Sequence, residues 1–413
     1  MAEHDLADAL AQVRQNTESL VAGLSPEDCM VQSMPDASPV KWHLAHASWF
    51  FEQFILRPRG AAPFDAAFSA IFNSYYVGAG PRHTRERRGD LSRPSLARVM
   101  AYRAYVTMAM ERLLRAAAPD AALAALVELG LAHEQQHQEL IVTDMKHHFW
   151  VQPLSPLWQP LADDPPAGGL PPLGYGAIDG GLVEIGAAAG GFAFDNERPR
   201  HRVWLAPFAL AERLVTETEY LAFIADGGYR TPGLWLSDGW AMRERQRWQA
   251  PLYWTCEDSA WRVHTWAGWR RLRADVPVCH LSHYEADAFA RWAGARLATE
   301  AEWEHAAQLR HAAGGWPTGA ALHDGRLHPT PTGARRQWGD CWEWTASSYL
   351  PYPGYRLPDG TVGEYNGKFM SGQMVLKGAS AATPAGHARL SYRNFFPPGA
   401  RWQFSGLRLA QDG

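Results

Sequence analysis

The sequence predicts an α+β protein with an N-terminal four-helix bundle and a C-terminal domain of short strands and loops. Three observations indicate this division. The first ~150 residues repeat apolar side chains with the period of an α-helix. Most of the 19 tryptophans lie after residue 180, among many glycines. A chain of 413 residues is also longer than a single core usually requires.

Four helices are expected in the first part. Proline suits the first turn of a helix, so Ser38-Pro39 and Ser92-Arg93-Pro94 are plausible starts. The expected helices span residues 6–24, 40–56, 94–117 and 121–149. Helices of this length with modest loops form a bundle. The connection of residues 60–91 is long, and long ordered loops are often functional.

A stretch rich in proline and glycine, residues 153–180, follows the helices. Its paired prolines and glycines are typical of a linker. The expected domains are therefore residues 1–152 and 181–413. In the second domain only residues 285–293 and 300–309 are convincing helices, so we expect aromatic packing and loop hydrogen bonds to hold it together.

Composition and charge exclude several classes of protein. Hydrophobic residues make up 46% and charged residues 20%, as in ordinary soluble proteins. A net charge of −4 gives no general attraction to nucleic acid or to acidic membranes. We expect a cytoplasmic protein without membrane spans, because neither a signal peptide nor a long apolar run is recognisable. The four separated cysteines are expected to be reduced packing residues.

The string HEQQH at residues 133–137 places two histidines one helical turn apart on one face. They could bind a metal, or they could be a partly exposed pair on an amphipathic helix. H-E-x-x-H is the signature of zinc proteases. However, the metzincin pattern needs glycine and histidine where this chain has Leu140 and Thr143. After Glu139 the next glutamate is Glu184, too distant for the other zincin pattern.

A facing helix of the bundle offers a different third ligand. The string KWHLAHASWFFE contains His43 and His46. His46 lies one turn before Phe50, an expected core residue, so we predict that His46 points inward and that His43 lies nearer the rim. With His133 and His137, His46 would leave half of an octahedron open. Imidazole suits iron as well as zinc, and open facial sites are typical of non-haem iron oxygen chemistry.

Several strings along nearly the whole chain together resemble one family. They are SPVKWHLAHASWFFE, FNSYY, HEQQHQE, CWEWTASSYLPYPGY, EYNGKFM and SYRNFFPPGARWQFSGLRLA. In this order they are similar to the ergothioneine-type sulfoxide synthases and their relatives, the selenoneine synthases. The resemblance implies a DinB-like bundle followed by a domain like the formylglycine-generating enzyme, with a C-type-lectin-like core.

The same resemblance implies a mononuclear iron(II) bound by His46, His133 and His137, with dioxygen as co-substrate. The implied reaction is oxidative coupling of a thiol or selenol to the imidazole C2 of hercynine, which is Nα-trimethylhistidine. Bringing the reactants to one metal would supply orientation. The implied partners are these small molecules, with no nucleic acid and no membrane.

Further residues match the family's substrate site. Gln136 would contact hercynine, although it could be a surface amide of its helix. Asn394, Phe395 and Phe396 match a C-terminal loop that reaches into that site. A trimethylammonium group cannot donate a hydrogen bond, so aromatic faces and amide dipoles suit it. Hydrophobic packing is the alternative for either phenylalanine.

The connection of residues 60–91 contains two more candidate groups. One of Tyr75 and Tyr76 would be a proton donor beside the metal, although both could instead pack the loop against the second domain. Arg82, Arg85 and Arg88 would bind the carboxylate of the sulfur donor, since guanidinium groups bind carboxylates bidentately. Their alternative is a solvated, charged surface.

Three strings depart from those of the thiol-using relatives. The chain has YYVG at residues 75–78 where YYEA is usual, SAATP at 380–384 for SCATP, and SHYEA at 282–286 for SYYEA. Drift on a packed surface would explain these changes. The sharper expectation is a bulkier, uncharged selenol donor such as 1-selenoglucose, on the way to selenoneine. The alternatives are cysteine or γ-glutamylcysteine as donor, a zinc hydrolase at the same histidines, and a binding module without enzymatic activity.

Overall fold

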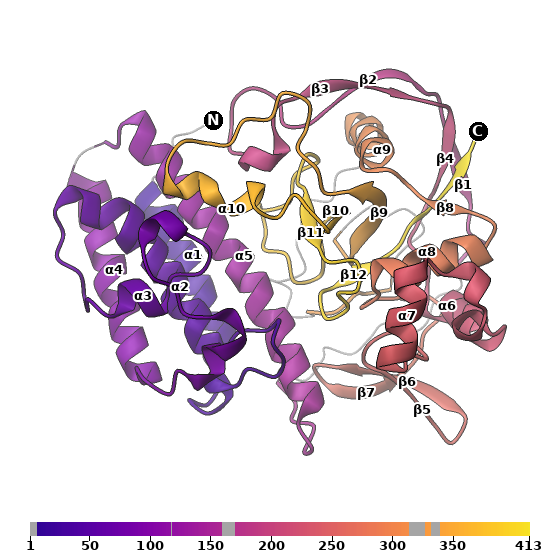
Figure 1. The fold of residues 1–413 in the computed structure, drawn as a ribbon, viewed down its shortest axis with the longest axis horizontal. Helices are drawn as coiled ribbons and strands as arrows, with labels where there is room; N and C mark the ends of the chain where they lie inside the picture. Colours follow the sequence, from indigo (N-terminus) through magenta and orange to yellow (C-terminus); the bar gives the residue numbers. More distant parts are fainter. Residues whose placement is uncertain (1–5, 117, 159–169, 314–326, 332–338) are drawn as a thin grey trace. The chain divides into compact units, whose positions relative to one another are not determined.

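The computed structural model describes residues 6–116, 118–158, 170–313, 327–331 and 339–413 (Figure 1). Contacts divide the chain into two compact units. The first unit comprises Met1–Leu154 and Arg356–Lys368, and the second comprises Ser155–Tyr355 and Phe369–Gly413. In the described ranges, no helix combines the length and the apolar character that crossing a membrane requires.

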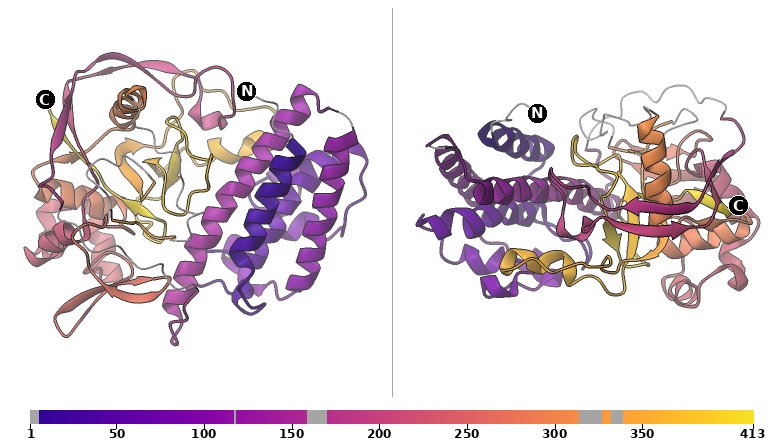
Figure 2. Two further views of the ribbon diagram at one scale, coloured as in Figure 1. Left: turned by 180° about the vertical axis from the view of Figure 1, so that it is seen from behind. Right: turned by 90° about the horizontal axis from the view of Figure 1, so that it is seen from above.

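The first unit is the predicted bundle, and Figure 2 shows its long helices side by side. They are α1 (Leu6–Val21), α2 (Val40–Phe51), α4 (Leu96–Ala116) and α5 (Ala121–Val151). Both α1 and α2 pack on α4 and on α5. Asp120 begins α5, because its carboxylate accepts the Leu123 N–H at 2.7 Å. The π-helical turn η2 (Glu52–Leu56) continues α2.

Short helical turns occupy the connections of the bundle. They are η1 (Asp28–Met30), η3 (Arg57–Arg59), α3 (Phe68–Ile71), η4 (Val77–Ala79) and η5 (Arg85–Asp90). The loop carbonyls of Leu91 and Ser92 accept hydrogen bonds from the buried Lys41 ammonium, at 2.6 and 3.3 Å. The end of the 60–91 connection is thereby tied to α2, so the loop is held against the bundle.

A distant segment completes the first unit. Residues 356–368 form η10 (Thr361–Gly363) and α10 (Glu364–Gly367), and η10 packs on η4. The Glu364 carboxylate accepts the N–H groups of Val77 and Gly78 at 3.0 and 2.9 Å. The Lys368 ammonium donates to the carbonyl of Tyr75 at 3.1 Å. This segment lies within residues 181–413, which the sequence analysis assigned to the second domain.

The described part of the second unit contains the strands β1 (Tyr175–Ile178), β2 (Gly181–Ile185), β3 (His201–Leu205), β4 (Phe208–Ala211), β5 (Trp254–Glu257), β6 (Ala260–Thr265), β7 (Gly268–Arg271), β8 (Arg296–Leu297), β9 (Trp342–Ser348), β10 (Met374–Gly378), β11 (Asn394–Phe396), β12 (Ser405–Gly406) and β13 (Leu409–Asp412). They form four sheets, ordered β1-β4-β13-β8, β11-β10-β9-β12, β5-β6-β7 and β2-β3. Strand β1 falls within residues 153–180, the expected linker, of which residues 159–169 lie outside the described ranges.

The second unit also contains the helices α6 (Glu217–Ala225), α7 (Ser237–Gln246), α8 (His283–Trp292) and α9 (Glu300–Ala312). The turn η6 (Asp195–Glu197) lies between β2 and β3, and the turns η7 (Gly228–Arg230) and η8 (Pro232–Leu234) lie between α6 and α7. Helices α8 and α9 were predicted, whereas α6 and α7 were not. The mixture of helices and sheets confirms the predicted α+β class.

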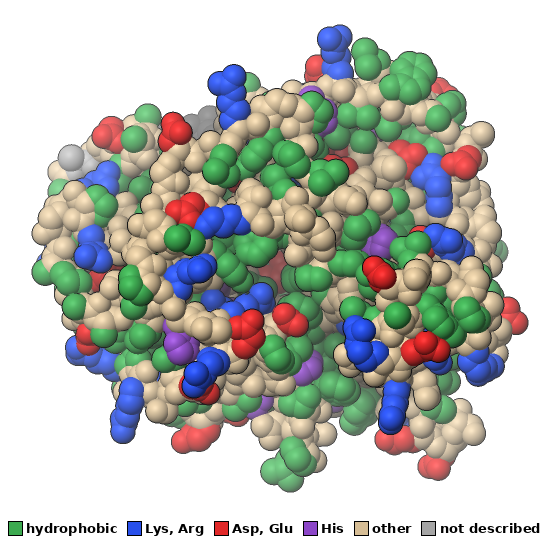
Figure 3. Space-filling model, in the orientation of Figure 1, with side chains coloured by type: hydrophobic (Ala, Val, Ile, Leu, Met, Phe, Trp, Pro, Cys, Tyr) green, Lys and Arg blue, Asp and Glu red, His purple; other side chains and the backbone are tan. Residues whose placement is uncertain are grey.

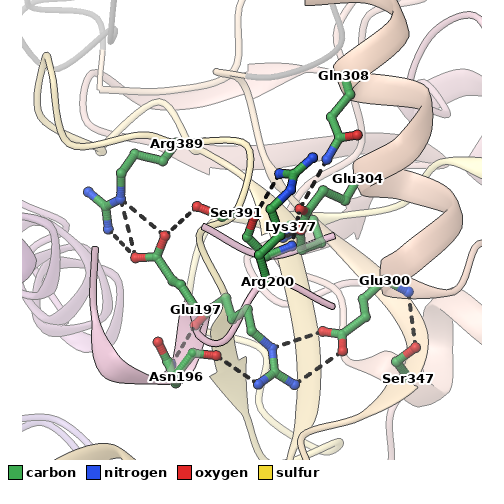
Figure 4. Close-up of polar contacts among 12 residues, drawn as sticks. Asn196, Glu197, Arg200, Glu300, Glu304, Gln308, Ser347, Lys377, Arg389 and Ser391 are labelled. Atoms are coloured by element: carbon green, nitrogen blue, oxygen red, sulfur yellow. Dashed lines mark hydrogen bonds and ion pairs between the residues drawn. The ribbon is translucent and has the colours of Figure 1, made fainter. Parts of the chain in front are cut away.

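In addition to the expected aromatic packing, buried ion pairs join separate segments of the second unit (Figure 4). The Glu197 carboxylate accepts from the Arg389 guanidinium at 2.6 Å and from the Ser391 hydroxyl at 2.6 Å. Lys377 and Glu304, both at most 1% exposed, pair at 2.9 Å. The attraction within these pairs and their additional hydrogen bonds offset part of the desolvation penalty of the buried charges. On the face shown in Figure 3, acidic and basic side chains are interspersed.

Candidate metal centre

Three imidazoles from two helices of the bundle meet in its interior. His46 comes from α2, and His133 and His137 come from α5. One nitrogen of each ring lies within 4.8 Å of the others, and all three side chains are buried. We call this group the three-histidine cluster. It contains the three residues that the sequence analysis proposed as metal ligands.

A glycine allows the two helices to approach at this level. A methyl group at Gly130 of α5 would lie 2.5 Å from the ring of Phe51 on α2. Such a contact is too short to be tolerated without a shift. Gly130 lies three residues before His133, whose ring stacks on Phe50 with centroids 4.7 Å apart. The small residue therefore brings the α5 histidines within reach of the α2 histidine.

Burial keeps the cluster in the form that binds metals. Burial lowers the pKa of His133 to about 4, although the neighbouring Glu134 opposes the shift. Burial also lowers the pKa of His46 and of His137 well below the ordinary value, and the adjacent imidazoles add to the effect. The rings are therefore neutral near pH 7, and each has a lone pair available for a metal ion.

The ring of His46 is held by a backbone acceptor and by two indoles. Its Nδ1 lies 2.6 Å from the carbonyl oxygen of Phe72, so Nδ1–H donates and Nε2 keeps the lone pair. The ring stacks on Trp42 and Trp49, with centroids 4.5 and 5.5 Å apart. These contacts fix both the tautomer and the orientation of this ring.

The structure corrects the prediction that His43 lies near the rim. His43 is only 2% exposed. Its Nδ1 lies 2.8 Å from Nδ1 of His137, and its Nε2 lies 3.1 Å from an Asp144 oxygen. His43 is thus a buried neighbour of the cluster.

Glu134, the glutamate of HEQQH, joins three helices of the bundle through buried ion pairs and hydrogen bonds. Its carboxylate accepts from Arg14 of α1 at 3.0 Å, from Arg103 of α4 at 2.9 Å and from the Thr17 hydroxyl at 2.8 Å. Burial alone would raise the pKa of Glu134, but the two guanidinium groups outweigh it and lower the pKa to about 2. In H-E-x-x-H proteases this glutamate is the general base. Here it is committed to two buried cations, which argues against a zinc hydrolase.

Arg88 is a buried cation next to the cluster. It is 4% exposed, and its guanidinium donates to the hydroxyls of Ser38 and Ser74, both at 2.8 Å. The same group stacks over the Trp42 ring at 3.4 Å, and Trp42 in turn stacks on His46. Burial lowers the pKa of Arg88 to about 10. Among the described residues its Nε has no hydrogen-bond partner.

The other predicted arginines differ in exposure. Arg85 is half-buried, donates to the carbonyl of Asp36, and has no acceptor for its Nε in the described ranges. Arg82 is exposed. Arg85 and Arg88 therefore carry N–H groups suited to an anion, whereas Arg82 has the character of a solvated surface charge.

The two predicted tyrosines have different environments. Tyr76 is 3% exposed and packs on Trp49 and Phe54, with ring centroids 5.6 and 5.0 Å apart. Tyr75 is half-buried, and its ring lies 5.8 Å from the ring of Tyr365 on α10. Sequence reasoning did not propose Tyr365, although it lies in the string EYNGKFM. Burial, together with Tyr75, raises the pKa of Tyr365, so its hydroxyl stays protonated.

The remaining predicted residues lie on α5 and in the second unit. Gln136 is half-buried on α5, one residue before His137. In β11, Phe395 stacks on Tyr349 with centroids 4.1 Å apart, and the Asn394 side chain accepts the Phe395 N–H at 2.9 Å. Phe396 packs on Trp402, at 5.5 Å between centroids. Their contact with substrate stays a prediction.

Comparison with known proteins identifies both parts of the chain. Residues 9–141 match the DinB superfamily. Residues 175–329 and 324–413 match the sulfatase-modifying factor enzyme 1-like domain. These matches confirm the two predicted folds. The chain is thus a protein of the class that joins a DinB-type helical bundle, here with a buried three-histidine cluster, to a sulfatase-modifying-factor-like domain.

Relatives of the same length narrow this class. The chain is 34% identical to the hercynine oxygenase of Mycobacterium tuberculosis, over 98% of each chain. It is 32% identical to the hercynine oxygenase of Mycolicibacterium thermoresistibile, over 99% of this chain and 95% of the relative. The enzyme of the same name from Mycolicibacterium smegmatis is 32% identical over the whole of both chains. The chain belongs to the hercynine oxygenase family.

Proposed function

We propose that this protein is a non-haem iron(II) enzyme that uses dioxygen to join a selenol donor to the imidazole C2 of hercynine. The observation that carries the proposal is the buried three-histidine cluster in a chain of the hercynine oxygenase family. The implied balance is one hercynine, one selenol and one dioxygen giving one selenoxide and one water. The C2–H and Se–H bonds break, and the C–Se bond forms.

The donor set of the cluster fits iron. It consists of neutral imidazoles, which suit iron(II), and three nitrogen ligands leave other coordination positions for reactants. An iron ion bound by the three histidines would supply the redox chemistry that activates dioxygen. The surrounding rings of Trp42, Trp49 and Phe50 would exclude water from the site.

Cationic and phenolic groups beside the cluster support roles in substrate binding and proton transfer. Arg88 and Arg85 would bind a carboxylate through the N–H groups that have no described acceptor. Tyr75 would be the proton donor, because Tyr76 is packed among aromatic rings. Gln136 would contact the imidazole of hercynine from its place beside His137.

The trimethylammonium group of hercynine needs aromatic faces and amide dipoles rather than hydrogen-bond donors. We assign this contact to Asn394, Phe395 and Phe396, which lie within the string SYRNFFPPGARWQFSGLRLA that resembles the family. All three are half-buried in the second unit.

Two kinds of donor, a selenosugar or a thiol, are compatible with these groups. The uncharged Val77-Gly78 pair beside Tyr75, where thiol-using relatives have a glutamate, favours a selenosugar such as 1-selenoglucose. The second candidate is cysteine or γ-glutamylcysteine, which the cations Arg85 and Arg88 favour. Of the other two altered strings, Ala381 and His283 lie in the buried interior of the second unit, at 0% and 4% exposure, where packing explains a substitution.

A competition assay distinguishes the donors. The iron-loaded protein would receive hercynine and dioxygen together with 1-selenoglucose, cysteine and γ-glutamylcysteine, and mass spectrometry would identify the products. We expect the hercynyl selenide or selenoxide to dominate. A dominant sulfoxide would refute the selenium donor and leave the iron chemistry intact. Peptidase activity with bound zinc, or the absence of any bound metal after anaerobic loading, would refute the iron enzyme itself.

A further inference from the structure

A chain of buried polar atoms leads from the start of α2 to the three-histidine cluster. The Ser38 N–H donates to an Asp144 carboxylate oxygen at 2.8 Å. The same oxygen lies 3.1 Å from Nε2 of His43. Nδ1 of His43 lies 2.8 Å from Nδ1 of His137. All four residues are less than 8% exposed.

The chemistry of these atoms determines where the protons lie. An ionised carboxylate can only accept hydrogen bonds, so the His43 Nε2 must carry a proton. A neutral imidazole then has its lone pair on Nδ1, so Nδ1 of His43 accepts. Nδ1 of His137 must therefore donate, and the lone pair of His137 lies on Nε2. The carboxylate of Asp144 thus selects, through His43, the tautomer of His137.

The other two rings of the cluster are held differently. His46 donates to a backbone carbonyl, an acceptor that no side-chain substitution removes. Nδ1 of His133 has no hydrogen-bond partner among the described residues. Among the described residues, His137 is therefore the ring of the cluster whose tautomer is set by a hydrogen bond to another side chain.

We infer that Asp144 and His43 are positioning residues that hold His137 in the tautomer that binds the metal. This inference rests on the proposed iron site. Hydrogen-bond partners of metal-binding histidines set ring orientation and ligand basicity, and losing one typically lowers metal affinity about 10- to 100-fold. His43 is not a ligand in this arrangement, because both of its nitrogen atoms are used within the chain.

Substitutions of Asp144 test whether its carboxylate sets the tautomer of His137. In Asp144→Leu the carboxylate that accepts from Nε2 of His43 is gone. His43 can then carry its proton on Nδ1 and no longer has to direct a lone pair at His137. We expect the affinity for Fe(II) to fall about 10- to 100-fold. Asp144→Asn is the conservative variant, because its amide oxygen can take both hydrogen bonds of the carboxylate oxygen. We expect it to bind Fe(II) within a few-fold of the wild type.

A double variant separates this role from a general loss of packing. An asparagine at position 43 can place its side-chain oxygen where Nδ1 of His43 lies, and it accepts from His137 without help from residue 144. Adding His43→Asn to Asp144→Leu is therefore expected to restore most of the affinity. His148→Leu is the matched control, since His148 is a buried imidazole of α5 that faces Asp28 instead of the cluster.

The measurement is Fe(II) affinity of the full chain under anaerobic conditions, by competition with a chelator, with thermal unfolding of the metal-free proteins as the folding check. If the wild type binds no Fe(II), the proposed iron site is wrong. If it binds and Asp144→Leu binds equally tightly, the positioning role is wrong. If the folded double variant stays as weak as Asp144→Leu, the tautomer mechanism is refuted.

Discussion

Replacing Glu134 with glutamine tests whether the glutamate of HEQQH supports the fold or the chemistry. The substitution keeps the shape and one oxygen but removes the charge that neutralises two guanidinium groups. Glu134 and Arg103 are fully buried, and the side chain of Arg14 is 3% exposed. Solvent therefore cannot screen the charges that remain.

The size of the effect follows from the pKa of Glu134 and agrees with a general magnitude for buried ion pairs. Arg14 and Arg103 lower the pKa of Glu134 from 4.5 to about 2 against the opposing effect of burial, and each pKa unit corresponds to about 1.4 kcal/mol. The free energy of unfolding should thus fall by about 3 kcal/mol. Removing one partner of a buried ion pair typically costs about 3–5 kcal/mol, which agrees. We expect a loss in this range at pH 7.

Urea unfolding of the full chain, followed by the helical circular dichroism signal, measures this loss as a lower midpoint of the bundle transition. Glu128→Gln is the control, because Glu128 is exposed on the same helix and should change stability by less than about 0.5 kcal/mol. The reasoning would be refuted if Glu134→Gln unfolded at the same urea concentration as the wild type and yet had no turnover. That result is the one expected for a general base.

The remaining predictions concern the cluster and its surroundings. Alanine at any one of the three clustered histidines should abolish iron binding and turnover, and metal analysis after anaerobic loading with Fe(II) would reveal a variant that keeps its iron. Arg88→Met should raise the KM of a carboxylate-bearing substrate about 10- to 100-fold, because a hydrogen bond to a charged group contributes about 1.5–3 kcal/mol. Its iron content should not change, and an unaltered KM for every substrate would contradict the anion-binding role. In Gly78→Ala the new methyl would lie 2.6 Å from the Thr361 hydroxyl and 2.8 Å from the Glu364 carboxylate. We therefore expect a lower kcat, by up to about a hundredfold if α10 shifts by 1 Å. Gly23→Ala, which has open space around it, is the control, and equal kcat values for the two variants would refute the prediction.

Local patterns predicted the elements whose signals lie within a few residues of each other. The bundle helices have apolar residues at helical spacing, and α9 begins at Thr299 with a capping box to Glu302. The spacing of one helical turn was enough to predict that the two histidines of α5 share a face. Helix α6 carries the same kind of capping box, from Thr216 to Glu219, so its signal was present and was missed.

The place of His43 could not be predicted from the periodicity of its own helix. The assignment to the rim assumed that α2 has a solvent-facing side. In the structure every residue of α2 is buried, because α2 packs on α4, α5 and η1. Spacing along one helix does not predict what covers its second face.

Tyr365 escaped prediction for a different reason. Its partner Tyr75 is almost 300 residues away, and no local signal assigns residues 356–368 to the helical unit rather than to the unit that surrounds them in the sequence. Contacts of this kind depend on the tertiary fold. The family resemblance drew attention to the string but did not indicate its neighbour.

The discontinuous first unit has a consequence for the order of folding during synthesis. Val77 and Glu364, which are hydrogen-bonded, are separated by 287 residues. At about 5–20 residues per second, a ribosome needs roughly 15–60 s to make the chain between them. Helices of the bundle form in microseconds or less. The nascent bundle must therefore wait with the loop of Tyr75 and Tyr76 uncovered until most of the second unit has been translated, and the proposed proton donor acquires its neighbour Tyr365 among the last contacts of the protein.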